Sequence, residues 1–211
     1  MANREPLKSL FFYQLFRQSV VRPMFHLYFR GRIHGLERMP QQGRVIIVSN
    51  HASDFDPPIV ASSMGRPVAF MAKEELFKVP ILKDAIRLYG AYPVKRGASD
   101  RSAIRAALDY LEQGWAAGLF MEGTRTPDGR IHNPKLGAAL IAAKAEAPLL
   151  PVCVWGTHAI LQEGSGMPRP VPVTVRVGEL IDPPRSTQRQ ELEAITQKCA
   201  DILNGLHDLG R

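Results

Sequence analysis

The first residues that could carry out chemistry are a histidine and an aspartate, five positions apart in the stretch NHASDFDPP. His51 follows residues 44–50, a β-branched run typical of a buried strand, so it comes where a strand ends. Ligands of open α/β sheets usually bind beyond the carboxyl ends of the strands. A carboxylate on one imidazole nitrogen fixes the tautomer and leaves the other nitrogen as a general base. His51 and Asp56 are therefore a candidate catalytic pair.

The spacing of this pair restricts how the two side chains can meet. On a regular helix a separation of five places two residues about 140° apart, so His51 and Asp56 can touch only across a turn. Two prolines follow Asp56, and proline is favoured at the first helical position, with aspartate at the cap before it. We expect a helix that begins after Asp56. A purely structural interpretation stays open, in which Asp56 only caps the helix and His51 is a polar loop residue.

A second candidate lies in the stretch FMEGTRTPDGR, again at the end of an apolar run. Gly123 allows the backbone to approach a ligand closely, Thr124 offers a hydroxyl, and Arg125 has a planar fork suited to phosphate. This combination predicts an anion-binding cradle. Glu122 would repel a phosphate, so it either positions Arg125 or accepts a hydrogen bond from a substrate hydroxyl. The alternative is an ordinary surface turn.

Two further basic positions follow strand-like runs. Lys73 follows residues 68–71, and Arg96 with its neighbour Lys95 follows the stretch GAYPV. Such residues are more often solvated charges than ligand groups. Their common location just past strand ends nevertheless raises the chance that they share one site with His51.

The cysteines and the beginning of the chain indicate the compartment. Cys153 and Cys199 match no metal-ligand spacing, so we predict reduced thiols and no metal site. The first 30 residues show no small-residue cleavage site after a continuous apolar core, which argues against a secretory signal peptide. Cytoplasmic residence is the expectation.

The positive charge of the chain is concentrated near its beginning. Residues 1–44 carry eight Lys or Arg against two Glu, a net of +6 out of the total of +7. A helical wheel places polar residues on one narrow stripe beside a wide apolar face: Gln14, Arg17, Gln18, Arg22, His26 and Arg30. The charges and Pro23 interrupt the apolar run well short of the ~20 residues that cross a bilayer. We therefore predict two short helices lying in an anionic membrane surface.

Two alternatives to membrane contact are a helical hairpin packed on its own domain and one packed on a second subunit. Nucleic-acid binding is not predicted, because the arginines match no nucleic-acid motif. Residues 1–30 are thus predicted to be a membrane-association segment, and residues 31–211 the folded domain.

The rest of the chain alternates between strand and helix patterns, which predicts an α/β fold with a mostly parallel sheet flanked by helices. Expected strands lie near 31–37, 44–50, 68–71, 90–97, 116–123, 148–156 and 171–180, and expected helices at 100–114, 137–147 and 187–206.

Four of these stretches together resemble the motif blocks of the glycerolipid acyltransferases, in the same order and approximate spacing: NHASDFDPP, GAYPVKRG, FMEGTRT and APLLPVCVWGT. The resemblance covers roughly residues 30 to 180 and is closest to the bacterial 1-acylglycerol-3-phosphate acyltransferases. It implies an α/β acyltransferase domain with a membrane-engaging helical element, on the cytoplasmic face of the cell membrane. Met121 and Pro93 depart from the pattern, which usually has proline and phenylalanine there, and Pro93 could alter acceptor preference.

The resemblance also implies a reaction and roles for the candidate residues. An acyl group would pass from acyl-CoA or acyl-carrier protein to the 2-hydroxyl of lysophosphatidic acid, with no other cofactor. In our hypothesis His51 removes the hydroxyl proton and Asp56 orients His51. The remaining residues would serve the substrates: Arg96, Arg125 and Thr124 would bind the acceptor phosphate, Lys73 the phosphate or donor, and Glu122 with Gly123 would shape the acceptor site.

We expect no covalent acyl-enzyme. The donor thioester is already activated, and the chain lacks the Gly-x-Ser-x-Gly elbow of α/β-hydrolases, so Ser49, Ser53 and Cys153 are not assigned as nucleophiles. Other acceptors remain possible, namely glycerol 3-phosphate, a lysophospholipid or a lyso-aminolipid. A thioesterase or lipid hydrolase, or a peripheral membrane protein without catalytic activity, are the more distant alternatives.

Overall fold

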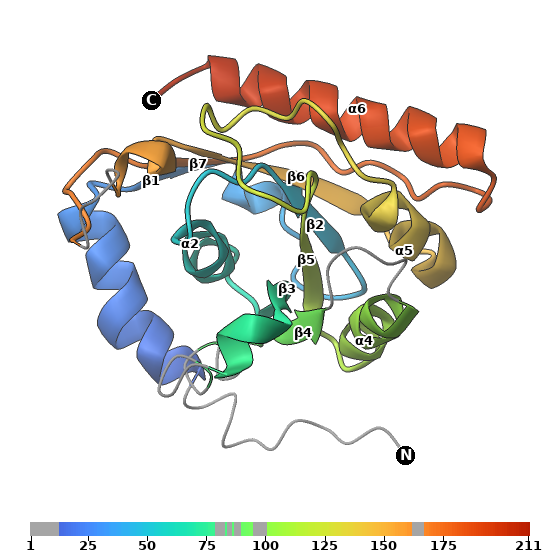
Figure 1. Cartoon of the computed structure of the whole chain (residues 1–211), viewed down its shortest axis with the longest axis horizontal. Helices are drawn as coiled ribbons and strands as arrows, with labels where there is room; N and C mark the ends of the chain where they lie inside the picture. The colour runs from blue at the N-terminus through green and yellow to red at the C-terminus, as the bar shows by residue number, and fades with distance from the viewer. Residues whose placement is uncertain (1–12, 79–82, 84–85, 87–89, 95–100, 162–166) are drawn as a thin grey trace.

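The computed structural model describes residues 13–78, 83, 86, 90–94, 101–161 and 167–211. In this part of the chain, seven strands form one sheet in the order β1-β7-β6-β2-β5-β3-β4 (Figure 1). The strands are β1 (Arg32–His34), β2 (Ile46–Ser49), β3 (Val68–Lys73), β4 (Tyr92–Val94), β5 (Ala116–Phe120), β6 (Leu149–Trp155) and β7 (Thr174–Val177). Only β6 and β7 pair in antiparallel fashion, whereas the other neighbours are parallel. The predicted α/β fold with a mostly parallel sheet is therefore confirmed.

The helical elements cover both faces of the sheet. They are η1 (Arg17–Val21), η2 (Met24–Tyr28), η3 (Leu36–Arg38), α2 (Asp56–Ser63), η4 (Glu74–Lys78), α4 (Arg101–Glu112), α5 (Gly137–Ala145), η5 (Thr157–Ala159) and α6 (Arg189–Asp208). In Figure 1, α2 and the N-terminal helix lie on one side of the sheet, and α4, α5 and α6 on the other.

The central strand β2 shows why its sequence is apolar without alternation. It pairs with β5 on one side and β6 on the other, and all four of its residues are buried. Ile47 packs into the core beneath α2 and the N-terminal helix. Ile46 and Val48 pack into the core beneath α4, α5 and α6. Because successive side chains of a strand point to opposite faces, a strand covered on both faces needs apolar residues at every position.

The N-terminal helix runs from residue 13 to 28, including the π-helical elements η1 and η2. The expected break at Pro23 is absent, since this residue has helical dihedrals and the wider π turns accommodate the missing N–H. One face packs on the domain through Tyr13, Val21, Phe25 and Phe29, all at most 2% exposed. Within the described residues, none of the helices combines the length and hydropathy needed to span a bilayer.

Arg17 corrects the predicted polar stripe of this helix. Its side chain is 7% exposed, and its Nε donates to the Ser62 carbonyl at 3.1 Å near the end of α2. The Tyr13 hydroxyl donates to the neighbouring Ala61 carbonyl at 3.4 Å. The last carbonyls of a helix have no partners within it, so these two side chains hold the carboxyl end of α2. The helical wheel predicted that Arg17 lies on the polar stripe, because the residue type alone carries no information about the carbonyls at the end of α2.

Candidate active site

The His51 and Asp56 side chains meet at the carboxyl end of β2. His51 Nδ1 lies 2.9 Å from Asp56 Oδ2, and the aspartate is fully buried. The same oxygen accepts the backbone N–H groups of Ala52 and Ser53, both at 2.7 Å. A carboxylate held by three donors is a strong acceptor, so the proton of the neutral imidazole resides on Nδ1. The opposite nitrogen, Nε2, makes no hydrogen bond to the described residues and is free to act as a base.

The position of Asp56 differs in detail from the prediction. It is the first residue of α2, and the preceding Phe55 occupies the cap position without a side-chain bond to the helix. The Asp56 carboxylate turns back to the loop instead of capping its own helix. Pro57 and Pro58 fit the first turn because the N–H groups they lack would have no helical partner there. Asp56 therefore fixes the loop that carries His51.

The loop after β5 is fastened directly to the backbone around His51. The Met121 N–H donates to the Ser49 carbonyl at 2.9 Å, and the Thr126 N–H donates to the His51 carbonyl at 2.8 Å. The Thr126 hydroxyl donates to the same carbonyl at 3.2 Å. Between these anchors Gly123 adopts a φ of 67°, a left-handed conformation that glycine tolerates best. Gly123 and Thr124 are exposed beside the histidine loop, and the anion-binding cradle stays a prediction.

Asn50 ties three segments together next to His51. Its Nδ2 donates to the Gly129 carbonyl at 2.7 Å and to the Val154 carbonyl at 2.8 Å. Its Oδ1 accepts the Val154 N–H at 2.8 Å. The side chain is 3% exposed. Asn50 therefore joins the end of β2 to β6 and to the loop that follows β5.

Arg125 has an ion-pair partner that the sequence analysis did not foresee. Its Nη1 lies 2.5 Å from Asp54 Oδ2, and the two side chains are 50% and 69% exposed. An exposed pair of this kind contributes little to stability, about 0 to 1 kcal/mol. The guanidinium therefore sits beside the His51 loop in a position from which it can exchange its carboxylate partner for another anion.

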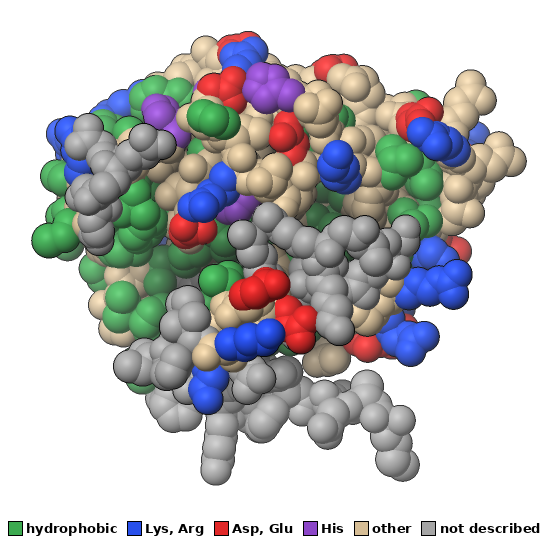
Figure 2. All heavy atoms as spheres, in the orientation of Figure 1, with side chains coloured by type: hydrophobic (Ala, Val, Ile, Leu, Met, Phe, Trp, Pro, Cys, Tyr) green, Lys and Arg blue, Asp and Glu red, His purple; other side chains and the backbone are tan. Residues whose placement is uncertain are grey.

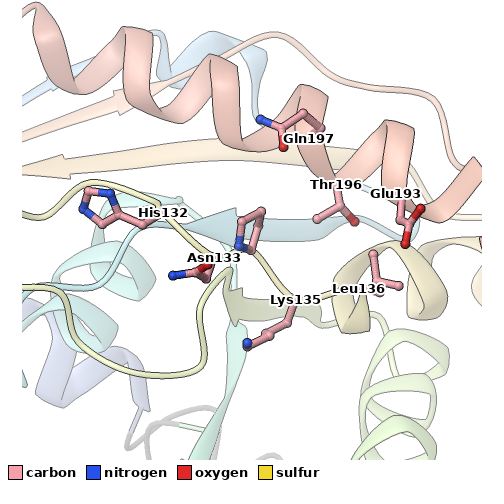
Figure 3. A pocket seen from close by; sticks show the side chains of 8 residues that line it. His132, Asn133, Lys135, Leu136, Glu193, Thr196 and Gln197 are labelled. Atoms are coloured by element: carbon pink, nitrogen blue, oxygen red, sulfur yellow. The ribbon is translucent and has the colours of Figure 1, made fainter. Parts of the chain in front are cut away.

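Glu122 contacts the backbone of its own loop rather than Arg125. Its carboxylate accepts the N–H of His132 and the N–H of Asn133, the second at 2.9 Å. The adjoining residues 132–136 line a surface cavity of about 480 Å³ against α6 (Figure 3). None of the predicted site residues lines this cavity.

The carboxyl-terminal half of α6 holds the far end of the same loop. Asn204 makes two hydrogen bonds of 2.9 Å with the backbone of Ile131, and Arg130 forms an ion pair with Asp208. The hydrogen bond from Arg130 holds the pKa of Asp208 below its ordinary value. The loop is thus fixed at its start by β2 and at its end by α6.

For two of the predicted basic residues, Lys73 and Arg96, the described part of the structure gives no side-chain position. Lys73 is the last residue of β3, and its side chain lies outside the described part of the structure. Arg96 also lies outside the described residues. Their roles stay predictions.

The thiols and hydroxyls near His51 are poorly suited to nucleophilic attack. Cys153 is 1% exposed, and burial raises the pKa of its thiol to about 12, so the reactive thiolate is scarce at neutral pH. The Ser49 hydroxyl donates to the Asn50 carbonyl and is fully buried. In the described part of the chain, no group of three or more His, Cys, Asp or Glu residues is arranged to hold a metal ion.

The fold and the site define an α/β protein with a histidine paired to a buried carboxylate at the carboxyl end of its central strand. Residues 30–155 match the Acyltransferase family, and the chain belongs to that family. The family resemblance read from the four motif blocks is thereby confirmed.

Named relatives extend this comparison. The chain is 33% identical over 141 residues to the chloroplastic 1-acyl-sn-glycerol-3-phosphate acyltransferase BAT2 of Brassica napus, covering 65% of this chain and 41% of that protein. It is 30% identical over 153 residues to the 1-acyl-sn-glycerol-3-phosphate acyltransferase of Borreliella burgdorferi, covering 71% and 61%. The chain thus spans between about two fifths and three fifths of these relatives. The crystal structure of the 1-acyl-sn-glycerophosphate (LPA) acyltransferase PlsC from Thermotoga maritima superimposes with a TM-score of 0.71 at 27% identity, covering 94% of this chain and 85% of that one.

Three residues of the site were missed by the sequence analysis. Asn50 carried a usable signal, because a polar residue directly after a buried strand must find hydrogen-bond partners. Asp54 lies between the two candidate residues of the first motif, but its partner is 71 positions away. Phe120 looked like an ordinary strand residue, yet its ring stacks on the imidazole of His51.

We predict that Asn50→Ala lowers the free energy of unfolding by about 2–3 kcal/mol, because it leaves the Val154 N–H and two buried carbonyls without partners. Urea unfolding measures this loss, and amide hydrogen exchange at Val154 should accelerate. The control is Asn133→Ala, at an exposed position of the loop after β5, which should change stability by no more than roughly 0.5 kcal/mol. Equal effects of the two substitutions would contradict the role assigned to Asn50.

Proposed function

We propose that this protein transfers a fatty acyl group from acyl-CoA or acyl-carrier protein to the 2-hydroxyl of 1-acylglycerol 3-phosphate, forming phosphatidic acid for phospholipid biosynthesis. The observation that carries the proposal is the 2.9 Å contact between His51 Nδ1 and the buried Asp56 carboxylate. Support for the substrates comes from the family and from the relatives, which are named for this activity.

The proposed chemistry is direct acyl transfer between two bound substrates. His51 Nε2 removes the proton of the acceptor hydroxyl, and the oxygen attacks the thioester carbonyl. The tetrahedral intermediate then collapses as the C–S bond breaks, and the thiolate takes the proton from the imidazolium. Asp56 keeps Nδ1 protonated and stabilises the positive ring. Holding both substrates in place lowers the barrier without a covalent acyl-enzyme, consistent with the buried state of the Cys153 thiol.

The acceptor phosphate is assigned to the cradle after β5. Arg125 binds it by exchanging its contact with Asp54, and Thr124 adds a hydroxyl. Arg96 is assigned to the same phosphate and Lys73 to the phosphate or the donor, as the family resemblance implies. Glu122 organises the acceptor site indirectly, through the backbone N–H groups of residues 132 and 133 that it holds.

The N-terminal helix is proposed to bring the site to an anionic membrane surface. Its outer face exposes Leu15 by 50%, Val20 by 44%, Leu27 by 79% and Tyr28 by 42%. Tyr28 donates to the Pro168 carbonyl at 2.7 Å, and nearby Met167 is 76% exposed. Figure 2 shows hydrophobic side chains gathered at the left, where Figure 1 places this helix. Apolar residues beside basic ones suit the boundary between lipid headgroups and acyl chains, and we assign this contact to the cytoplasmic face of the membrane.

We predict that His51→Ala lowers kcat for acyl transfer by about 10²- to 10⁴-fold, because the general base is lost. Asp56→Asn should also lower kcat strongly, since it removes the charge that orients the imidazole. The assay follows phosphatidic acid formed from radiolabelled acyl-CoA or acyl-carrier protein, with folding checked by circular dichroism. If the wild type releases fatty acid at a rate that does not depend on the acceptor, the protein is a hydrolase. If folded His51→Ala transfers the acyl group at the full rate, His51 is not the general base.

We predict that Arg125→Ala raises KM for lysophosphatidic acid about tenfold or more, because a charge-assisted contact to phosphate contributes roughly 1.5–3 kcal/mol. KM for the acyl donor should be unchanged. Arg130→Ala is the matched control, since Arg130 lies in the same loop and pairs with Asp208. Competition with glycerol 3-phosphate and with lysophospholipids then identifies the preferred acceptor. A larger effect on the donor than on the acceptor would reassign Arg125.

We predict that Leu27→Glu weakens sedimentation with vesicles containing anionic lipid, because it puts a charge into the most exposed apolar position of the N-terminal helix. Leu209→Glu is the control, with the same substitution at a 64% exposed leucine after α6. Point substitutions suit this test better than a deletion of residues 1–30 would, because such a deletion would remove the buried Phe25 and Phe29 from the core. If both variants sediment like the wild type, the helix is not the membrane contact.

A further inference from the structure

His51 belongs to a stack of three rings. Its imidazole lies against the Phe120 ring with a centroid distance of 4.0 Å and an interplanar angle of 15°. The Phe120 ring in turn stacks on Phe70, at 5.1 Å and 22°. The rings come from three segments: the loop after β2, the end of β5 and the middle of β3.

A glycine makes room for this stack. Phe70 and Gly118 are direct partners across the β3–β5 pairing. A Cβ atom at position 118 would lie 2.5 Å from the Phe70 ring, closer than side-chain atoms pack. The Phe70 ring therefore covers the bare backbone of Gly118, and Phe120, two residues further along β5, projects from the same face. Any larger residue at 118 would displace Phe70 and the ring stacked on it.

The stack restrains a motion of the imidazole that the aspartate leaves free. The contact between His51 Nδ1 and Asp56 acts in the plane of the ring, so it permits the ring to tilt about that bond. Stacking acts perpendicular to the ring and opposes such tilting. The two contacts together determine the direction of the Nε2 lone pair.

We infer that Phe120 is a positioning residue that fixes the orientation of the His51 imidazole, with Phe70 and Gly118 as its support. The catalytic consequence rests on the proposed function: a fixed lone pair points at the acceptor hydroxyl. The negative face of the Phe120 ring also lies against the imidazole when it becomes positively charged during proton transfer.

The first test separates positioning from folding by kinetics. Phe120→Leu keeps an apolar side chain but removes the flat ring, so kcat should fall between about 10- and 100-fold, with KM for both substrates unchanged. Phe120→Tyr keeps the aromatic ring and should therefore retain most of the wild-type kcat. Trp115→Leu is the control for a lost aromatic, because Trp115 precedes the opposite end of β5, is 5% exposed and packs on Tyr13 and Tyr110. It should lower stability without lowering kcat of the folded enzyme.

The second test does not depend on activity. In protein labelled with ¹³Cε1-histidine, the His51 resonance is assigned by its absence from His51→Gln. A ring stacked on the imidazole shifts the Cε1–H proton upfield, so this proton should move downfield in Phe120→Leu and stay in place in Trp115→Leu. Removal of only the support, in Phe70→Leu, should give a smaller displacement in the same direction.

The outcomes distinguish this inference from the proposed function. Unmoved His51 resonances in folded Phe120→Leu would overturn the inference, whatever the enzyme's substrates. A moved resonance with an unchanged kcat would also overturn it, because orientation would then not matter for the reaction. If the wild type transfers no acyl group to lysophosphatidic acid, the proposed function fails, and the resonance shift alone decides whether Phe120 orients His51.

Discussion

The buried Asp56 carboxylate is the constraint on which the rest of the site depends. One of its oxygens accepts His51 Nδ1 and two backbone N–H groups, while the other has no partner among the described residues. Burying a carboxylate is costly unless donors surround it. The loop that joins β2 to α2 therefore has to fold around this oxygen, and that folding brings the histidine to the carboxyl end of the central strand.

The other contacts of the site extend from this turn in two directions. On the side of β5, the Ser49 and His51 carbonyls accept hydrogen bonds from the N–H groups of Met121 and Thr126. The loop after β5 therefore starts at a fixed distance from the imidazole. On the opposite side, α2 begins at Asp56 and ends at carbonyls held by Tyr13 and Arg17. The N-terminal helix, whose outer face exposes both apolar and polar side chains, is thus joined to His51 and Asp56 through one helix of eight residues.

The proposed base, His51, is held more rigidly than Arg125, the proposed anion-binding residue. His51 is restrained by Asp56 in the plane of its ring and by Phe120 perpendicular to it. Arg125 instead holds an exposed carboxylate, Asp54, which water and other anions can replace. This difference suits the proposed reaction, in which proton transfer requires fixed geometry and the acceptor phosphate must bind and leave.

Local patterns in the sequence were sufficient for the parts of the protein that depend on neighbouring residues. The apolar run of β2 and the helix and strand periodicities predicted the α/β fold, and the prolines after Asp56 predicted the turn that lets it reach His51.

The partners of buried polar and aromatic groups depend on segments far apart in the chain. Arg17 turned inward because the end of α2 presented carbonyls, and Asp54 met Arg125 only because β2 and β5 are neighbours. Phe120 met His51 for the same reason, and a hydrophobic strand residue carries no local signal for the ring it will contact. The sequence by itself thus determined the strands and helices of the α/β domain and the candidate catalytic residue types, whereas the tertiary structure decided their partners, because strand order in the sheet is set by packing between distant segments.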